Sequence, residues 1–525
     1  MARPSIDPNT TRRSFAAMSH SPFTADFDNL AKEVMEYWRV PGLAIGVIDG
    51  DETYSKGYGF ATLPDVPATA DTLWYVGSTT KAFTAAALAR MIASNEHITL
   101  RDGWSTTISS IIRDDFVLQD AWATAHLTLD DAVCHRTGMV GYRHAWQATR
   151  EGRSITIKEF VRNMRYLSPE AEPRTKWIYS NALYVTLAHV IETVAGESLE
   201  SVMKDLIWDP LHMETTYLNL RDALDGPEHL ASGYYWDETA KSYNEVPTID
   251  VEPINGAGGI LSNVADFTKW IRCLIQMSKP FSDTEHEDMR KPRMMMMSTP
   301  NSDLYGLGWI QKQYKGHQVY THDGGTHAYG ASVWWLPGVK YGVVAFGNTA
   351  GSSNDAESEL VRRLIDAKLG VSGADSDDFS STRLNRESDN AMNQVNRAVD
   401  ILFPDRPSPT LPPTINATEL QGTYRSQGYG TVTFEIEAHP THPDQKILAA
   451  YRPEMVWRYY MKLHHVSGDY WIMYLGGMEN PTLFREYQAC QFKIGIDSKA
   501  VGFEVDWKDT IRGISEGTVW FEKLS

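Results

Sequence analysis

The run at 77–81 reads Gly-Ser-Thr-Thr-Lys and opens an apolar stretch. Residues three apart lie on one face of a helix, so the Lys81 amine can come within hydrogen-bond reach of the Ser78 hydroxyl. Burial beside residues such as Phe83 and Leu88 disfavours a charged lysine, which lets the amine accept a proton near neutral pH. The pattern therefore predicts a serine nucleophile with a lysine base, although alone it also describes an N-capping serine beside a surface lysine.

Two further motifs follow along the chain. Residues 177–181 read Trp-Ile-Tyr-Ser-Asn and open a second helical stretch, and residues 321–325 read Thr-His-Asp-Gly-Gly between two predicted strands. Taken singly, Tyr179 describes a core tyrosine, Asn181 a helix cap and His322 a turn residue. Phenol, carboxamide and imidazole groups can also shuttle protons and bind a substrate, so their joint occurrence favours a catalytic site over three separate structural roles.

In this order the three motifs resemble the S-x-x-K, Y-x-N and K-T-G motifs of the serine β-lactamase and penicillin-binding-protein superfamily. The third motif has the H-x-G form of the class C-like branch, which includes esterases, D-aminopeptidases, D-peptidases and acyltransferases. The resemblance covers about residues 25–370. Further stretches support it: Val40-Pro41-Gly42, Cys134-His135-Arg136-Thr137-Gly138, Gly256-Ala257-Gly258-Gly259 and Tyr305-Gly306-Leu307-Gly308-Trp309.

The resemblance implies catalytic roles for Ser78, Lys81 and Tyr179. Ser78 would form an acyl-enzyme, and Lys81 would help to deprotonate it. Tyr179 would pass the proton to the leaving group and later activate water. The expected function is therefore hydrolysis of an ester or amide bond in a small molecule or short peptide.

The resemblance also implies substrate-binding roles for five residues. Asn181 would bind a carbonyl or amide on the acyl side, and His322 would orient Tyr179. The backbone N–H groups of Ser78 and Gly325, with Gly324 beside them, would form an oxyanion hole. Asp323 stands where relatives carry a residue that binds a substrate carboxylate. We therefore expect β-lactams and peptides with a free terminal D-amino acid to be poor substrates, and neutral or amine-bearing molecules to be better.

The same resemblance leaves several functions open. An acyltransferase would use the same acyl-enzyme with an alcohol or amine in place of water. A D-aminopeptidase or D-peptidase would differ only in its substrate, and a non-catalytic scaffold would keep only the fold. Assembly into a homo-oligomer also stays open.

The elements that must position these motifs form a layered α/β (α+β) domain, an antiparallel sheet flanked by helices with a helical subdomain. Asp49-Gly50-Asp51 between two apolar runs predicts a hairpin. Helices are expected at 81–93, 157–166, 181–195, 198–206 and 263–277, and strands at Leu43–Ile48, Thr53–Gly59, 316–321, 329–336 and 341–347.

The chain divides into four parts by composition. Residues 1–24 form a flexible arm, 25–370 the catalytic domain, and 371–414 a linker that contains a helix at roughly 388–402. Residues 415–525 hold short β-type runs that resemble a lipocalin-like barrel. The barrel could cover the active site, shape its pocket or mediate assembly, and the segment Tyr142–Arg153 is expected to form a wall of the cleft.

Composition excludes other classes of protein. The 525 residues carry 49 Lys and Arg against 67 Asp and Glu, and a net charge of −18 argues against nucleic-acid binding. There is no run of about 18 apolar residues that would predict a membrane span. The three cysteines are too dispersed in sequence for a disulfide framework or a zinc site, and we expect no metal or cofactor. No apolar segment follows Arg12-Arg13, as a twin-arginine export signal would require. We therefore expect a cytoplasmic protein.

Overall fold

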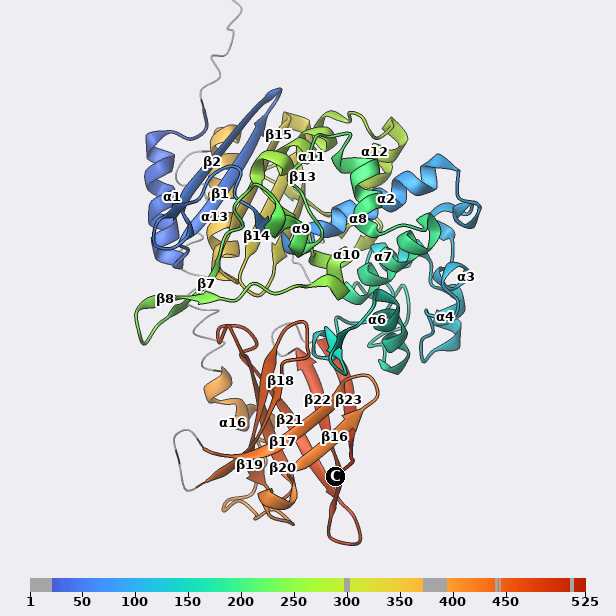
Figure 1. The fold of residues 1–525 in the computed structure, drawn as a ribbon, viewed down its shortest axis with the longest axis vertical. Coiled ribbons are helices and arrows are strands. Elements are labelled where there is room, and N and C mark those ends of the chain that lie inside the picture. Colours follow the sequence, from blue (N-terminus) through green and yellow to red (C-terminus); the bar gives the residue numbers. More distant parts are fainter. Residues whose placement is uncertain (1–20, 297–302, 372–393, 440–441, 443–444, 510–513) are drawn as a thin grey trace, which may run out of the picture.

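The computed structural model describes residues 21–296, 303–371, 394–439, 442, 445–509 and 514–525. They form an α/β domain with a β-barrel at one end (Figure 1). The predicted fold class is thus confirmed. Most of the arm predicted at 1–24 and part of the linker helix predicted at 388–402 lie outside the described residues.

The central sheet is antiparallel and joins strands from both ends of the domain. Its strands are β1 (Gly42–Asp49), β2 (Glu52–Thr62), β3 (Val66–Pro67), β10 (Met294–Met295), β11 (Leu304–Tyr305), β12 (Ile310–Tyr314), β13 (His317–Gly325), β14 (Gly330–Leu336) and β15 (Tyr341–Gly347). Within the described residues the sheet has nine strands, in the order β10-β11-β12-β13-β14-β15-β1-β2-β3. The predicted hairpin is confirmed: β1 and β2 pair up to Asp49 and Glu52, and Gly50 takes the left-handed backbone conformation in the turn.

Helices cover both faces of this sheet, and others form a helical subdomain beside it (Figure 1). They are α1 (Ala25–Trp38), α2 (Thr80–Ser94), α3 (Ile108–Ile111), α4 (Ala121–His126), α5 (Leu129–Val133), α6 (Ile157–Asn163), α7 (Asn181–Ala195), α8 (Leu199–Met203), α9 (Leu220–Asp225), α10 (Asn255–Gly258), α11 (Val264–Gln276), α12 (Asp283–Arg290) and α13 (Ser352–Leu369). The helices predicted at 81–93, 181–195 and 263–277 are confirmed as α2, α7 and α11. Among the described helices, none combines the length and the apolar character that crossing a membrane would require.

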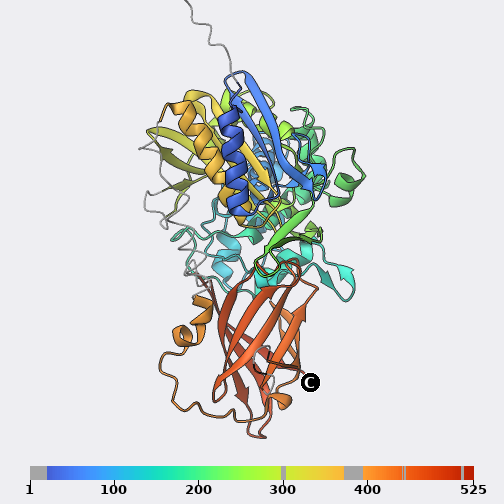
Figure 2. The ribbon, with the colours of Figure 1, turned by 90° about the vertical axis from the view of Figure 1, so that its left-hand side faces the viewer.

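Alternation along the strands explains the two covered faces. In β1, Leu43, Ile45 and Val47 pack with α1 and α13, whereas Ala44 and Ile48 belong to the larger core on the other face. Figure 2 shows α1 and α13 side by side in front of the sheet. The motif-bearing helices α2 and α7 lie on the opposite side, in the larger core.

The C-terminal region is a closed barrel, as the resemblance to lipocalin-like domains predicted. The eight strands found in its described part are β16 (Gly422–Ser426), β17 (Gly430–Ala438), β18 (Lys446–Arg452), β19 (Tyr459–Ser467), β20 (Tyr470–Gly477), β21 (Glu486–Ile494), β22 (Ala500–Asp509) and β23 (Ile514–Lys523). The described part of the linker contains α16 (Ala398–Leu402), which packs on the barrel. Aromatic side chains fill the interior: the buried Phe503 ring lies 5.1 Å from the Tyr424 ring and 4.7 Å from the Phe521 ring. In its described part, the barrel interior is therefore packed with aromatic side chains.

The segment predicted as a cleft wall, Tyr142–Arg153, packs against the mouth of the barrel. The His144 ring stacks on Trp507 with centroids 4.5 Å apart, and Val456 donates a backbone hydrogen bond to Trp146 over 2.9 Å. The sequence-based placement of this segment rested on the resemblance of the catalytic domain alone and did not include this contact with the barrel. The segment joins the two bodies.

Candidate active site

Ser78 and Lys81 lie together at the start of α2, as their spacing predicts. Ser78 is in the 3-10 turn Gly77–Thr79 that leads into the helix, and Lys81 is in the first helical turn. The Lys81 Nζ lies 3.1 Å from the Ser78 Oγ. It also donates hydrogen bonds to the Asn181 Oδ1 over 2.5 Å and to the Ala257 carbonyl over 2.7 Å.

Burial favours the neutral form of the Lys81 amine. Its side chain is fully buried, and this burial lowers the pKa of the amine well below its usual value. A neutral amine has two N–H donors and one lone pair. Since Asn181 and Ala257 accept from the two donors, the lone pair is left to accept the Ser78 O–H, as a general base requires.

Gly324 and Gly325 bring the end of β13 against the nucleophile turn. A Cβ at Gly324 would stand 2.0 Å from the Val76 carbonyl, and a Cβ at Gly77 would stand 2.5 Å from the Gly325 nitrogen. Only glycine permits this approach, and Gly77 also has a positive φ of 53°. The backbone N–H of Gly325 consequently lies beside the residue that precedes Ser78.

Tyr179 lies two residues before α7, separated from it by the N-cap Ser180, and next to Lys81, with the lysine Nζ 4.8 Å from its ring centroid. Its ring is half-buried and lies 4.5 Å from the His135 ring and 6.3 Å from the His322 ring. Asn181 is the first residue of α7, so its carboxamide belongs to a residue two positions after Tyr179. The Y-x-N motif thus joins the S-x-x-K motif in one site.

His322 is buried and has two hydrogen-bond partners. Its Nδ1 lies 2.6 Å from the Asp323 carbonyl and its Nε2 lies 3.1 Å from the Tyr305 hydroxyl. Burial, together with nearby Lys81, lowers the pKa of His322 to about 3, so the ring is neutral at pH 7. A neutral ring that donates from Nδ1 to a carbonyl must accept at Nε2, which identifies Tyr305 as the donor.

Asp323 is not brought together with the other predicted residues. Successive side chains of a strand point to opposite faces, and His322 points toward Tyr179. The Asp323 side chain is exposed and accepts a hydrogen bond from the Ser332 Oγ over 2.8 Å. The expectation that this carboxylate repels a substrate carboxylate therefore loses its structural basis.

His135 lies in the site, although the sequence analysis gave it no role and named it only as part of the Cys-His-Arg-Thr-Gly stretch. Its ring is buried between Tyr179 and Tyr305, with centroids 4.5 Å and 4.9 Å away. The Ser180 backbone N–H donates to its Nδ1 over 3.1 Å, and the Ile178 N–H donates to its carbonyl over 2.8 Å. His135 thus holds the backbone on both sides of Tyr179, and the Cys-His-Arg-Thr-Gly stretch was the signal that could have indicated this role.

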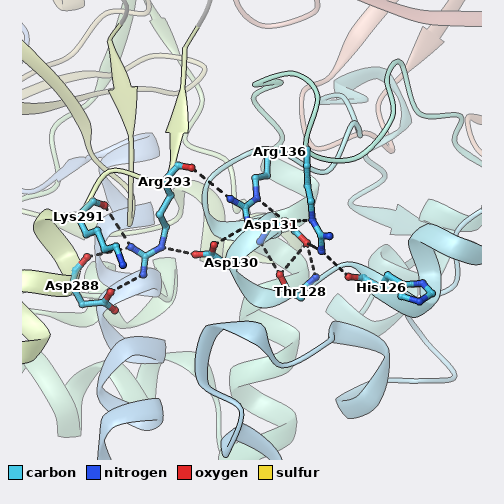
Figure 3. A network of polar contacts seen from close by, with 9 residues as sticks. His126, Thr128, Asp130, Asp131, Arg136, Asp288, Lys291 and Arg293 are labelled. Carbon is cyan, nitrogen blue, oxygen red and sulfur yellow. Dashed lines mark hydrogen bonds and ion pairs between the residues drawn. The ribbon is translucent and has the colours of Figure 1, made fainter.

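A chain of alternating charges supports the same loop (Figure 3). The buried Asp131 accepts from Arg136 Nε over 2.6 Å and from Arg174 Nη2 over 2.7 Å. Asp130 links Arg136 to Arg293, with distances of 2.9 Å and 2.5 Å. The Arg174 backbone N–H also donates to the Arg136 carbonyl over 2.6 Å, which ties the segment leading to Tyr179 to the one carrying His135.

Replacing Asp131 by asparagine is expected to lower the free energy of unfolding by roughly 2 kcal/mol at pH 7. Burial alone would raise the pKa of Asp131, but hydrogen bonds from Arg174, Thr128 and Arg136 outweigh it and hold the pKa below its usual value. A depressed carboxyl pKa contributes stability above the unfolded value of about 4 and loses it as the pH falls through the folded value. The difference between variant and wild type should therefore shrink below about pH 4 in thermal and urea unfolding.

Asp130→Asn provides the matched control for this experiment. Its side chain is 24% exposed and bonds to the same Arg136, so its replacement should cost less. A stability difference for Asp131→Asn that is equally large at pH 7 and pH 3.5 would contradict the assigned role of the carboxylate charge.

The groups around Ser78 define what the site can do. They are a hydroxyl, a buried amine, a phenol, a carboxamide, neutral imidazoles and the backbone N–H groups beside Ser78. This set suits proton transfer to and from a serine nucleophile and stabilisation of an oxyanion. In the parts of the chain that the structure describes, no group of three or more His, Cys, Asp or Glu side chains is arranged to hold a metal ion.

Comparison with known proteins agrees with this chemistry. The Beta-lactamase family model matches residues 27–368. The unguisins hydrolase of Aspergillus violaceofuscus is 36% identical over 86% of this chain and 82% of its own length, and that of Aspergillus campestris is 34% identical over 82% and 81%. The solved octameric penicillin-binding protein homologue from Pyrococcus abyssi shares the fold with a TM-score of 0.58 and 20% identity, covering 95% of this chain and 99% of that one. The chain belongs to the beta-lactamase family of serine hydrolases.

Proposed function

We propose that the protein hydrolyses an amide or ester bond of a small molecule or short peptide through an acyl-enzyme on Ser78. One observation carries this proposal: the buried Lys81 amine lies 3.1 Å from the Ser78 Oγ and has acceptors for both of its N–H groups. A surface lysine near a capping serine would have neither the burial nor these partners.

In the acylation step, Lys81 takes the Ser78 proton while Oγ attacks the substrate carbonyl. The carbonyl oxygen becomes an oxyanion, which the N–H groups of Ser78 and Gly325 stabilise. Tyr179 then delivers a proton to the leaving amine or alcohol as its bond to the carbonyl carbon breaks. The products of this step are the Ser78 ester and the free leaving group.

Deacylation reverses the direction of proton flow. Water enters on the side vacated by the leaving group and loses a proton to the Tyr179 and Lys81 pair as it attacks the ester carbonyl. The Ser78 oxygen leaves and regains its proton from Lys81. Asn181, whose Oδ1 accepts from Lys81, would direct its amide N–H groups to a carbonyl on the acyl side of the substrate.

The choice of substrate rests on two further observations. Two relatives above 30% identity are unguisins hydrolases, which favours an unguisin or a related amide as the substrate of this chain. His322 is neutral at pH 7, whereas a lysine at this position would supply a positive charge for a substrate carboxylate. We therefore keep β-lactams and peptides with a free terminal carboxylate as poor substrates, on the ground of the missing charge.

The test is intact-mass detection of an acyl adduct. The full chain is exposed to p-nitrophenyl butyrate, D-amino-acid amides, a β-lactam and an unguisin, and quenched in acid within the first turnover. We expect a mass increase equal to the acyl group, located on Ser78 by peptide mapping, with the ester and the neutral amides and not with the β-lactam.

Two variants make the result decisive. Ser78→Ala should show no adduct and no p-nitrophenol burst. Ser332→Ala, which removes a buried hydroxyl on β14 that donates to the Asp323 side chain, should keep the adduct and the burst. An adduct that persists in Ser78→Ala would remove the assigned nucleophile.

A further inference from the structure

The proposed oxyanion hole uses a peptide unit between two glycines, Gly324 and Gly325. Neither residue has a Cβ, so side chains place no steric limit on rotation of this peptide plane. Gly324 has no room for a side chain, because its Cβ would stand 2.0 Å from the Val76 carbonyl oxygen. The direction of the Gly325 N–H therefore depends on the contacts that the peptide makes.

Asn354 of α13 supplies such a contact. Its Nδ2 donates over 2.6 Å to the Gly324 carbonyl and over 3.2 Å to the Ala331 carbonyl of β14. Gly324 and Ala331 are register partners in the sheet. Carbonyl oxygens only accept hydrogen bonds, so they identify the facing atom as the amide nitrogen. The Asn354 side chain thus bridges the ends of β13 and β14.

The first turn of α13 is packed directly on this end of the sheet. Gly330 is the register partner of Gly325. A Cβ at Gly330 would stand 2.3 Å from the Ser353 Oγ and 2.9 Å from the Asn354 backbone nitrogen. A side chain at this position would push the helix away. The half-buried Asn354 amide is therefore held against β13 by the packing of the helix.

The hydrogen bond from Asn354 fixes the direction of the Gly325 N–H. The peptide between Gly324 and Gly325 is trans, and in a planar trans peptide the C=O and N–H groups point in opposite directions. Since the C=O is held beside Asn354, the N–H points away from it. The register of β12 with β13 ends at Thr321, and farther along β13 a Cβ at Gly77 would stand 2.5 Å from the Gly325 nitrogen. The N–H is thus presented beside the turn that carries the nucleophile.

We propose that Asn354 is a positioning residue for the oxyanion hole. It holds the Gly324 carbonyl so that the Gly325 N–H faces the oxygen on which negative charge develops. Without this bond the peptide plane is free to rotate and to present its C=O, which is an acceptor, to the oxyanion. Asn354 acts through the peptide and not on the substrate. This inference rests on the proposed function, because it needs an oxyanion formed by attack of Ser78.

The test compares two esters that differ in one atom. p-Nitrophenyl butyrate places an oxygen in the oxyanion hole, and O-p-nitrophenyl thionobutyrate places a sulfur, which is a weak hydrogen-bond acceptor. With either ester the Ser78 oxygen bonds to the acyl carbon and p-nitrophenolate leaves, so both acylation rates are read from the same burst. The oxo-to-thiono rate ratio reports the N–H groups of the hole, whereas loss of nucleophile or of folded protein lowers both rates equally.

Asn354→Asp and Asn354→Leu both remove the amide donor and keep the approximate shape of the side chain. The oxo-to-thiono ratio should fall at least about 10-fold in each, because one oxyanion-hole donor contributes about 10²- to 10³-fold to the rate. A carboxylate is favoured in the first turn of a helix, so Asn354→Asp should keep α13 folded. Ser353→Ala is the matched control: it removes a buried hydroxyl that donates to the Thr349 carbonyl and should keep the ratio within about twofold.

A second substitution at the peptide gives a readout that a purely structural role would not move. Rotation of the peptide plane by half a turn gives residue 325 a positive φ, which alanine disfavours. Position 325 has room for a methyl group, since the nearest atom to a Cβ there is the Asn354 Oδ1 at 3.6 Å. Adding Gly325→Ala to Asn354→Leu should therefore raise the oxo-to-thiono ratio at least about threefold.

The outcomes separate this inference from the proposed function. A wild-type burst that is absent in Ser78→Ala supports the nucleophile. With that burst present, a ratio that stays within about twofold of the wild type in the folded Asn354 variants overturns the positioning role, and one folded variant is sufficient for this comparison. If Ser78→Ala keeps the burst, the proposed function fails, and the inference fails with it.

Discussion

Lys81→Met is expected to lower the rate of Ser78 acylation about 10³- to 10⁴-fold, the upper part of the range for loss of a general base. Methionine has a similar length and no polar hydrogen, so it fills the buried space without leaving an unpaired charge. The Asn181 and Ala257 oxygens lose their donor, but the serine remains in place. The acylation rate is measured by the p-nitrophenol burst with p-nitrophenyl butyrate.

The pH dependence of the wild type should carry the signature of the same amine. Burial lowers the pKa of Lys81, and the neutral form is the base, so activity is present above the folded pKa and falls as protonation removes the lone pair. In Lys81→Met the residual activity should not show this acidic limb. The comparison requires a kcat/KM profile for each protein over the range in which both stay folded.

A second lysine provides the control. Lys312 lies on β12, 3.9 Å above the Trp334 ring, and burial lowers its pKa as well. Lys312→Met should leave acylation within about threefold of the wild type, because the amine packs with the core on the far side of the sheet. If Lys81→Met kept more than a tenth of the acylation rate, another group would have to be the base.

The parts of the site that are local in sequence were the ones that could be predicted. Ser78 and Lys81 are three residues apart, so helix geometry alone brings their side chains together. Tyr179 and Asn181 precede and open α7, but their placement against Lys81 depends on how two helices pack. For these residues the order of the motifs carried the prediction, and no spacing rule would have replaced it.

The placement of the other site residues depends on contacts between segments far apart in sequence, which could not be predicted. The face that Asp323 occupies follows from the alternation of β13, and a shift of one residue would have placed it in the site instead of His322. The sequence predicts a strand there, but it does not show whether the residues alternating with His322 or those alternating with Asp323 face the site. His135, whose hydrogen bonds hold the backbone beside Tyr179, has a φ of 62° although it is not a glycine. The sequence does not predict this left-handed conformation.

The relation between the two bodies was the feature least accessible from sequence. The barrel was predicted from its short strands, but its role was left open. In the structure the Asn480 Nδ2 donates over 2.8 Å to the His327 carbonyl, a contact between residues 153 positions apart. Such a bond depends on the docking of two complete domains and leaves no local trace.

Asn480→Asp is expected to lower acylation of Ser78 by about 10²-fold, the effect of a misplacement of roughly 1 Å at a reacting centre. Asn480 is buried, and it holds the turn that follows β13, the strand that ends at Gly325. An aspartate keeps the shape and still accepts from Thr482, as the asparagine Oδ1 does over 3.0 Å and 2.6 Å. It puts an oxygen where the amide donated, so the carboxylate repels the His327 carbonyl.

A positioning role for Asn480 makes a prediction that simple destabilisation does not. A protonated carboxyl regains an O–H donor, so the activity of Asn480→Asp relative to the wild type should rise as the pH falls. Thr482→Val removes the hydroxyl bond to the Asn480 Oδ1, keeps the backbone N–H bond and leaves the contact to His327, so it should keep acylation within about threefold. An Asn480→Asp protein with normal burst kinetics at every pH would show that the barrel does not position the turn after Gly325 for the proposed oxyanion hole.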